Sequence, residues 1–403
     1  MRDWTTSPTH RRWLERHGTE LLTFGRLTGR ADGGAAWLDD DGRPDLDAPT
    51  YTYISARMLH VYGIGSLLGV PGSGPVAARA LAGLRGRLRD ADAGGWHHAV
   101  DATGGPVAGG KSCYDHAFVL LGASTAVEAG LPGARELLAE AEAVFLERFW
   151  DEDAGLCRDG WDAGFRNPDP YRGLNSNMHA VEALLSVASA TGDRAVRVCS
   201  FVARGAAEHE WRIPEHYDAD WRPILDYNRD RPDDQFKPYG STVGHGLEWS
   251  RLFLHAEAAG SAAGGEWLRD GAAALFDRAV ADGWNADGGT GFVYTCDWDG
   301  TPVVRDRLHW VLAEAINAAA ALHRRTGDDR FAAAYREWWD HADERFLDHE
   351  RGSWVHQLSP DNLPDDSVWA GKPDLYHAFQ TTVVPRVPLY PMLATAVASG
   401  LIE

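Results

Sequence analysis

A histidine and a carboxylate lie three residues apart in segment 244–249, which reads Gly-His-Gly-Leu-Glu-Trp. If this segment is helical, His245 and Glu248 share one face, one turn apart. Histidine titrates closest to neutral pH, so it can both take and return a proton. The spacing favours acid/base chemistry, although one His-x-x-Glu pattern is weak support by itself.

His245 also belongs to a series of polar residues that recurs about every 65 positions. Its six members are Arg57, His116, His179, His245, His309 and His377. Each precedes an alanine-rich, apolar run of helical character that ends at or near a glycine. Six units that each present a polar group at a helix start predict a ring with a shared centre.

The elements that must position these residues alternate between two kinds of helix. We expect a first helix over 8–28, and inner helices over 51–69, 115–129, 175–191, 243–259, 306–326 and 376–399. Partner helices, charged on one face and apolar on the other, are expected over 75–90, 134–150, 194–211, 266–282 and 329–347. Glycine C-caps in the short turns mark where several helices end.

These expected helices number twelve. The first and the last of them have no partner in sequence, so they can pair and close the ring. Glycine- and aromatic-rich connections predict short β-hairpins or loops at one mouth. The expected fold is therefore all-α, an α6/α6 barrel formed by a single domain over residues 1–403.

The amino-acid composition limits the classes of molecule that the protein is expected to bind. A formal charge of -20 disfavours nucleic acid and anionic membranes, which need clustered Lys and Arg. The 4 cysteines have no zinc-site spacing, and no apolar signal core or long apolar run is present, so we expect a cytoplasmic protein with free thiols. Its 17 tryptophans suit the apolar faces of sugar rings, although most large aromatics belong to the core.

Several kinds of site fit a centre lined by histidines. A metal needs three or four ligands around one point, and groups spread evenly around a ring lie too far apart. Acid/base work on a neutral sugar fits better, because Arg57 can hold an oxygen that becomes negative in an enediolate. A sugar-binding module would not need these groups. A glycosidase needs two carboxylic acids, for which the candidates are Asp115, Glu248, Glu314 and Asp374.

Several stretches of the chain resemble the N-acylglucosamine 2-epimerase superfamily, and within it the branch of mannose and sulfoquinovose isomerases. The most specific are the Gly-His-x-x-Glu-Trp stretch at 244–249 and the Gly-Lys-Pro-Asp-x-Tyr-His stretch at 371–377. Further similarity lies at 33–39, 53–57, 114–118 and 175–179, so the resemblance spans nearly the whole chain. It implies an α6/α6 barrel with no cofactor and no obligatory metal.

The resemblance also implies roles for particular residues. His245 and His377 are the expected catalytic histidines, with Glu248 supporting His245. Arg57 and His179 are expected to hold sugar hydroxyls or the reacting oxygens. The expected sugar contacts are Tyr114, His116, Asn175 and Trp310.

Residues 372–374, Lys-Pro-Asp, resemble the isomerase branch, which favours interconversion of D-mannose and D-fructose with D-lyxose and D-xylulose as a side reaction. A sugar 2-epimerase, a sulfoquinovose isomerase and a glycoside hydrolase remain alternatives, and the negative charge disfavours the sulfonated sugar. The expected partner is a monosaccharide, and nothing in the sequence predicts an oligomeric state.

Overall fold

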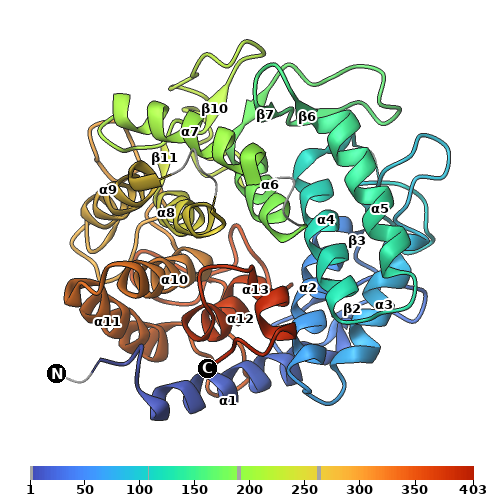
Figure 1. Ribbon diagram of the computed structural model, residues 1–403, viewed down its shortest axis with the longest axis horizontal. Helices are drawn as coiled ribbons and strands as arrows, with labels where there is room; N and C mark the ends of the chain where they lie inside the picture. Colours follow the sequence, from blue (N-terminus) through green and yellow to red (C-terminus); the bar gives the residue numbers. More distant parts are fainter. Residues whose placement is uncertain (1–2, 108, 188–191, 261–264) are drawn as a thin grey trace.

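Two concentric layers of helices make up the computed structural model, which describes residues 3–107, 109–187, 192–260 and 265–403 (Figure 1). The inner layer consists of α2 (Thr52–Leu67), α4 (Cys113–Glu128), α6 (Leu174–Ser186), α8 (Val243–Ala258), α10 (His309–Thr326) and α12 (Tyr376–Val383). The outer layer consists of α1 (Pro8–Phe24), α3 (Ser73–Arg85), α5 (Ala134–Val144), α7 (Gly192–Glu208), α9 (Gly265–Gly283) and α11 (Asp329–Arg345). The expected α6/α6 barrel is confirmed.

The two layers differ in how their side chains are buried. Inner helices such as α8 are buried on all faces from Val243 to Ala256, because they pack between the outer layer and the barrel interior. Outer helices bury one stripe, as α11 does with Phe331, Tyr335 and Trp338, and leave charged residues in solvent. None of the helices in the described ranges is both long enough and apolar enough to cross a membrane.

The first helix and the last inner helix close the ring, as the sequence indicates. Helix α1 begins at Pro8 behind the N-cap Ser7, whose side chain accepts a hydrogen bond from the His10 amide. It then packs against α12 and completes the sixth pair of helices.

The predicted inner helix over 376–399 is wrong in its second half. Helix α12 ends at Val383, and after the 3-10 turn η3 (Val384–Arg386) the chain forms a separate helix, α13 (Leu393–Ala398). Prolines at 385, 388 and 391 cause the break, since each lacks an amide hydrogen and clashes with the preceding turn. Thr395 of α13 donates to Glu128 at the C-terminal end of α4, so α13 covers the end of the ring away from the helix starts.

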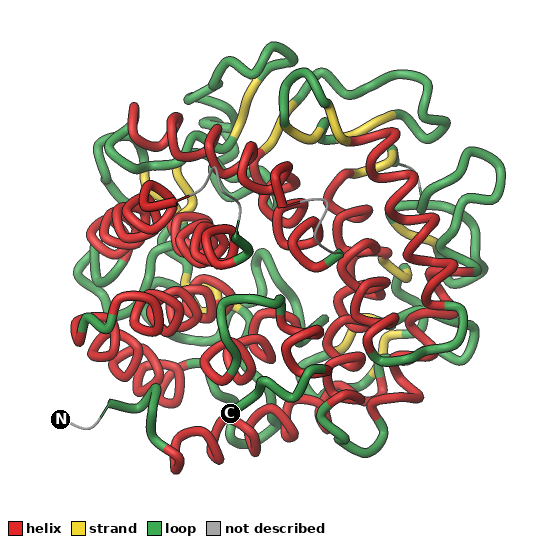
Figure 2. The backbone as a smooth tube through the Cα atoms, in the orientation of Figure 1, coloured by secondary structure: helices red, strands yellow, loops and turns green. Residues whose placement is uncertain are grey.

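Short strands fix where the inner helices begin (Figure 2). Five inner helices follow directly on a two-residue strand: β3 (Thr50–Tyr51), β5 (Lys111–Ser112), β9 (Arg172–Gly173), β11 (Ser241–Thr242) and β13 (Arg307–Leu308). These pair antiparallel with β4 (Ala99–Val100), β8 (Gly160–Trp161), β10 (His216–Tyr217), β12 (Thr295–Cys296) and β14 (Gln357–Leu358), respectively. The other pairs are β1 (Trp37–Leu38) with β2 (Pro44–Asp45), and β6 (Trp150–Asp151) with β7 (Leu156–Cys157). Among these pairs, β1–β2 and β6–β7 are local hairpins, as the sequence predicts. The five pairs ahead of the inner helices are different, because each joins two strands that flank an inner and an outer helix, and they hold the helix starts at one mouth.

Helices α2 and α4 approach closely because each carries a glycine at their contact. A Cβ at Gly122 would lie 2.7 Å from the backbone oxygen of Ala56, which cannot move aside. We expect Gly122→Ala to lower the free energy of unfolding by about 1–3 kcal/mol, measured by denaturant titration. Gly74→Ala is the control, since its nearest neighbour would be Ser66 Oγ at 3.7 Å. Equal stability of the two variants would contradict the prediction.

Candidate active site

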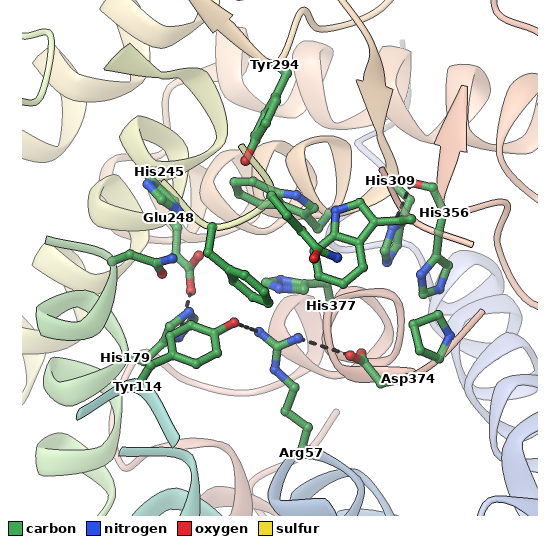
Figure 3. Close-up of a pocket in the computed structure, with 16 residues that line it drawn as sticks. Arg57, Tyr114, His179, His245, Glu248, Tyr294, His309, His356, Asp374 and His377 are labelled. Atoms are coloured by element: carbon green, nitrogen blue, oxygen red, sulfur yellow. Dashed lines mark hydrogen bonds and ion pairs between the residues drawn. The ribbon is translucent and has the colours of Figure 1, made fainter. Parts of the chain in front are cut away.

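A pocket lined by aromatic side chains and several polar groups opens at the mouth where the inner helices begin (Figure 3). Such a lining is typical of small-molecule sites. It is lined by Arg57, Tyr114, Asn175, His179, Gln235, Phe236, His245, Glu248, Tyr294, His309, Trp310, His356, Trp369, Pro373, Asp374 and His377. Residues expected to act together from the sequence, spread over more than three hundred positions, therefore converge on one cavity.

Eight of the nine residues that the sequence assigned to the site line this pocket. They are Arg57, Tyr114, Asn175, His179, His245, Glu248, Trp310 and His377. The structure gives their positions, and their roles stay predictions.

His116 is the exception. Its Nδ1 donates to the Ser112 carbonyl at 2.6 Å, and its Nε2 accepts from the Trp96 amide at 3.2 Å. The ring packs on Phe149, and burial lowers the pKa of His116 to about 3. Both nitrogens are occupied by the protein, so the expectation that His116 contacts a sugar is wrong. Tyr114, two residues earlier, lines the pocket instead.

Two imidazoles in the pocket each have a carboxylate behind them. His245 Nδ1 donates to Glu215 at 3.0 Å, and His377 Nδ1 donates to Glu314 at 3.1 Å. A carboxylate at Nδ1 holds the proton there and leaves Nε2 free for proton transfer. The Trp310 ring lies 5.3 Å from His245 and 5.7 Å from His377, between centroids. The site therefore contains two oriented bases, both close to the Trp310 ring.

The prediction that Glu248 supports His245 is wrong, because Glu215 holds that imidazole. Glu248 instead lies 3.9 Å from His179 Nδ1 and 3.4 Å from Arg251. Glu215 comes from the connection ahead of β10, thirty positions before the histidine, and no local pattern links the two.

A fixed cation stands beside the two bases. Arg57 donates from Nη1 to Asp374 at 3.0 Å and from Nη2 to the Tyr114 hydroxyl at 2.7 Å. The Phe118 ring lies under the guanidinium, 4.4 Å from its carbon. Burial opposes the charge of Arg57, but Tyr114 and Asp374 keep its pKa above the ordinary value. Arg57 can therefore stabilise negative charge on a bound oxygen without having to move.

A buried ion network forms the floor of the pocket. Arg251 donates to Glu314 at 2.9 Å and to Glu248 at 3.4 Å, and lies 3.9 Å from Glu182. One cation cannot balance three buried carboxylates. Burial, and then repulsion from Glu314, raise the pKa of Glu248 well above its usual value, whereas the pKa of Glu314 and of Glu182 is lowered. Of these three carboxyl groups, Glu248 is therefore the one whose protonated form is most favoured, and it lines the pocket.

The spacing argument against a metal does not hold in the structure. Potential ligand atoms of Glu248, Glu314 and His377 lie within 4.8 Å of one another, as do those of His179, Glu182 and Glu248. The inner helices converge more closely at this depth than an even ring suggests. The Arg251 guanidinium, however, already occupies the space among these carboxylates and repels a second cation.

Residues from the connections complete the pocket, and most of them were not predicted from the sequence as site residues. Gln235 and Phe236 form part of its lining, and Gln235 donates to the Val368 carbonyl at 3.4 Å. Trp369 and Asp374 come from the loop ahead of α12, and Asp374, one of the candidate acids for a glycosidase, lies in the 371–377 stretch that carried the family resemblance. Tyr294, His356 and Pro373 were also missed, whereas His309 belongs to the series of polar residues that predicts the shared centre.

The Glu314→Gln variant tests whether Glu314 orients His377 and raises its pKa. Burial lowers the pKa of His377 and Glu314 opposes that shift, so the variant is expected to lower this pKa further. Because His377 is inactive as a base when protonated, the acid limb of the kcat/KM profile should move to lower pH. The maximal rate should fall by roughly a hundredfold or more as the ring loses its orientation. Glu136→Gln, on the exposed face of α5, is the control and should change neither quantity. An unmoved acid limb would contradict this role.

The fold and the site together define an α6/α6 barrel with an acid/base centre. A family model described as N-acylglucosamine 2-epimerase matches residues 33–381. The chain belongs to this family and is a sugar-converting enzyme of the isomerase and epimerase kind.

Relatives and solved structures agree with this family. The chain is 48% identical to a D-mannose isomerase of Thermobifida fusca, over 98% of this chain and 99% of that protein. It is 43% identical to a D-mannose isomerase of Pseudomonas cannabina pv. alisalensis, over 98% and 97%. A crystal structure of a D-mannose isomerase superposes with a TM-score of 0.87 at 27% identity, covering 94% of this chain and 99% of that chain. Cellobiose 2-epimerase of Spirochaeta thermophila shares the fold, with a TM-score of 0.80 at 19% identity over 94% and 96%.

Proposed function

We propose that this protein interconverts D-mannose and D-fructose, and also D-lyxose and D-xylulose, by acid/base catalysis through an enediol. The observation that carries the proposal is the pair of carboxylate-backed imidazoles, His245 and His377, facing one pocket beside Arg57. The D-mannose isomerases to which the chain is 43–48% identical support the choice of sugar.

The chemistry follows from these groups. In the open-chain sugar, Nε2 of His377 takes the proton from C2, and the C–H electrons form the C1=C2 double bond while the carbonyl oxygen gains a proton. His377 then returns its proton to C1, and loss of the C2 hydroxyl proton leaves the ketone. His245, held by Glu215, opens the sugar ring and moves the hydroxyl protons. Arg57 and the protonated Glu248 stabilise the oxygens on which negative charge develops.

A proton NMR assay in deuterated water tests the reaction. D-Mannose should give D-fructose with deuterium at C1, because a base that shuttles the proton exchanges it with solvent. Glucose as the primary product would instead identify a 2-epimerase, and cleavage of an oligosaccharide a glycoside hydrolase. Saturable binding without conversion would identify a sugar-binding module.

A 2-epimerase is the second candidate, because it needs bases on opposite faces of C2. Two separate imidazoles in one pocket, His245 and His377, would suit that demand as well. A sulfonated sugar fits less well, since Asp374 already neutralises Arg57, the cation in the pocket lining.

We also propose that the reaction needs no metal. Arg251 already supplies the positive charge among the carboxylates of the floor. A chelator added to the NMR assay should leave the rate unchanged, and inhibition that a divalent cation reverses would refute this.

A further inference from the structure

A second pair of imidazoles lies in the same pocket. His309, at the start of α10, stacks on His356, which precedes β14, with ring centroids 3.9 Å apart and planes at 21°. His309 Nδ1 donates to the His356 carbonyl at 3.2 Å, so its Nε2 is an acceptor. Figure 3 draws this pair on one side of His377 and His245 on the other.

The outward nitrogens of the pair lack partners. Nε2 of His309 and Nε2 of His356 are both buried, and neither has a hydrogen-bond partner among the described residues. Both side chains line the pocket and are about 95% buried. A buried polar atom without a partner costs stability, so such atoms usually mark a place where a ligand supplies the bond.

The surroundings of the pair select the kind of ligand. Burial lowers the pKa of His309 to about 3 and that of His356 well below its usual range. Positive charge on His377 would lower the pKa of His309 as well, and positive charge on His309 would lower that of His356. The pair is therefore neutral near pH 7 and offers no charge to a sulfonate or a phosphate. A hydroxyl fits, because it can donate to His309 Nε2 and accept from His356 when that nitrogen carries the proton.

We propose that His309 and His356 bind the hydroxyl on the terminal carbon of the sugar, and so determine specificity for hexoses with a free 6-hydroxyl. This inference rests on the proposed function, which puts C1 and C2 between His245 and His377. The chain of carbons then extends past His377, whose ring lies 6.4 Å from that of His309. The far end of a six-carbon sugar reaches the stacked pair, whereas the shorter lyxose leaves it unfilled.

Kinetics with D-mannose and 6-deoxy-D-mannose test the contact, since the two sugars differ only in that hydroxyl. Wild type should prefer D-mannose by roughly tenfold to a hundredfold in kcat/KM. In His356→Ala the preference should fall at least severalfold, because only D-mannose loses a bond while the bond to His309 remains. His356→Asn, which keeps a polar group, should retain part of the preference and serves if the alanine variant folds poorly. The proposal would be overturned if His356→Ala lost kcat/KM equally on both sugars, or if the wild type showed no preference between them.

His341→Ala is the matched control. His341 is also a buried imidazole whose Nε2 has no partner within the described ranges, but it packs on Trp284 and Phe346 outside the pocket. This variant can lose stability, yet its preference between the two sugars should equal that of wild type. A changed preference in His341→Ala would mean that the ratio reports packing and not contact.

Binding without turnover separates this inference from the proposed function. In a His245→Asn background, calorimetry should give tenfold or more tighter binding of D-mannose than of 6-deoxy-D-mannose, and adding His356→Ala should reduce the difference at least severalfold. If wild type converts no aldose but binding keeps this preference, the proposed reaction fails and the hydroxyl site stands. If wild type converts D-mannose but binding shows no preference, the reaction stands and the hydroxyl site fails.

Discussion

Replacing His377 with asparagine is expected to lower kcat on D-mannose by about 10³-fold. Asparagine is close in size and can still bond to Glu314, but it cannot take a proton from carbon. Exchange of the C2 proton with deuterated solvent, followed by NMR, should fall by the same factor. A variant that kept most of the wild-type turnover would contradict the assignment of His377 as the base.

The controls for this experiment separate chemistry from folding. The melting temperature and the affinity for sugar should stay close to wild type, because the pocket keeps its shape. His349→Asn changes an exposed histidine, with 64% of its side chain in solvent, and should leave kcat unchanged. Parallel loss of binding and stability in His377→Asn would indicate a structural role for this residue instead.

Replacing Arg251 with methionine is expected to lower the free energy of unfolding by about 3–5 kcal/mol. The side chain is completely buried among Glu182, Glu248 and Glu314, and its removal leaves their charge unbalanced away from water. Denaturant unfolding at pH 7 measures the loss. Arg330→Met is the control: it breaks a pair with Asp277 in which both side chains are about half exposed, and should cost less than about 1 kcal/mol.

The deficit of Arg251→Met should depend on pH. In the wild type the pKa values of Glu182 and Glu314 are lowered, so their contribution to stability is present above the ordinary value of 4.5 and is lost as pH falls. Without Arg251 their burial is unopposed and they take up protons at higher pH. The difference between variant and wild type should therefore be largest near pH 7 and shrink toward pH 4. A deficit independent of pH would mean that packing, not charge, holds the floor together.

The ring itself could be predicted from the sequence because its period is physical. Each unit consists of a helix buried on all faces and a helix buried on one, and this contrast is visible in composition. The shared centre could also be predicted, because five of the six polar residues in the series lie near the start of an inner helix and line the pocket.

His116, the sixth member of the series, lies outside the pocket for a geometric reason. Successive residues on an α-helix turn by 100°, so residues two apart face nearly opposite directions. Tyr114 faces the pocket, and His116 therefore faces the outer layer, where it bonds to Ser112 and Trp96. Spacing of about 65 residues cannot resolve a shift of two.

The carboxylates behind the histidines were harder to predict. Glu215 reaches His245 through the pairing of β9 with β10, which depends on strand register and leaves no trace near the histidine in sequence. Glu248 has the right spacing, but the buried Arg251 draws it to the floor. The break after α12 was readable, since three prolines within seven residues exclude a continuous helix.

Closure of the ring by α1 and α12 also governs how the protein can be made. During synthesis on the ribosome, α1 emerges early with an apolar stripe that includes Leu14, Leu21 and Leu22, and its partner follows about 350 residues later. Such distant pairing is slow and leaves that stripe uncovered while the nascent chain grows, which is the kind of surface that chaperones hold. The late segment also carries Asp374 and His377, so the enzyme acquires its base only when the last gap in the barrel is filled.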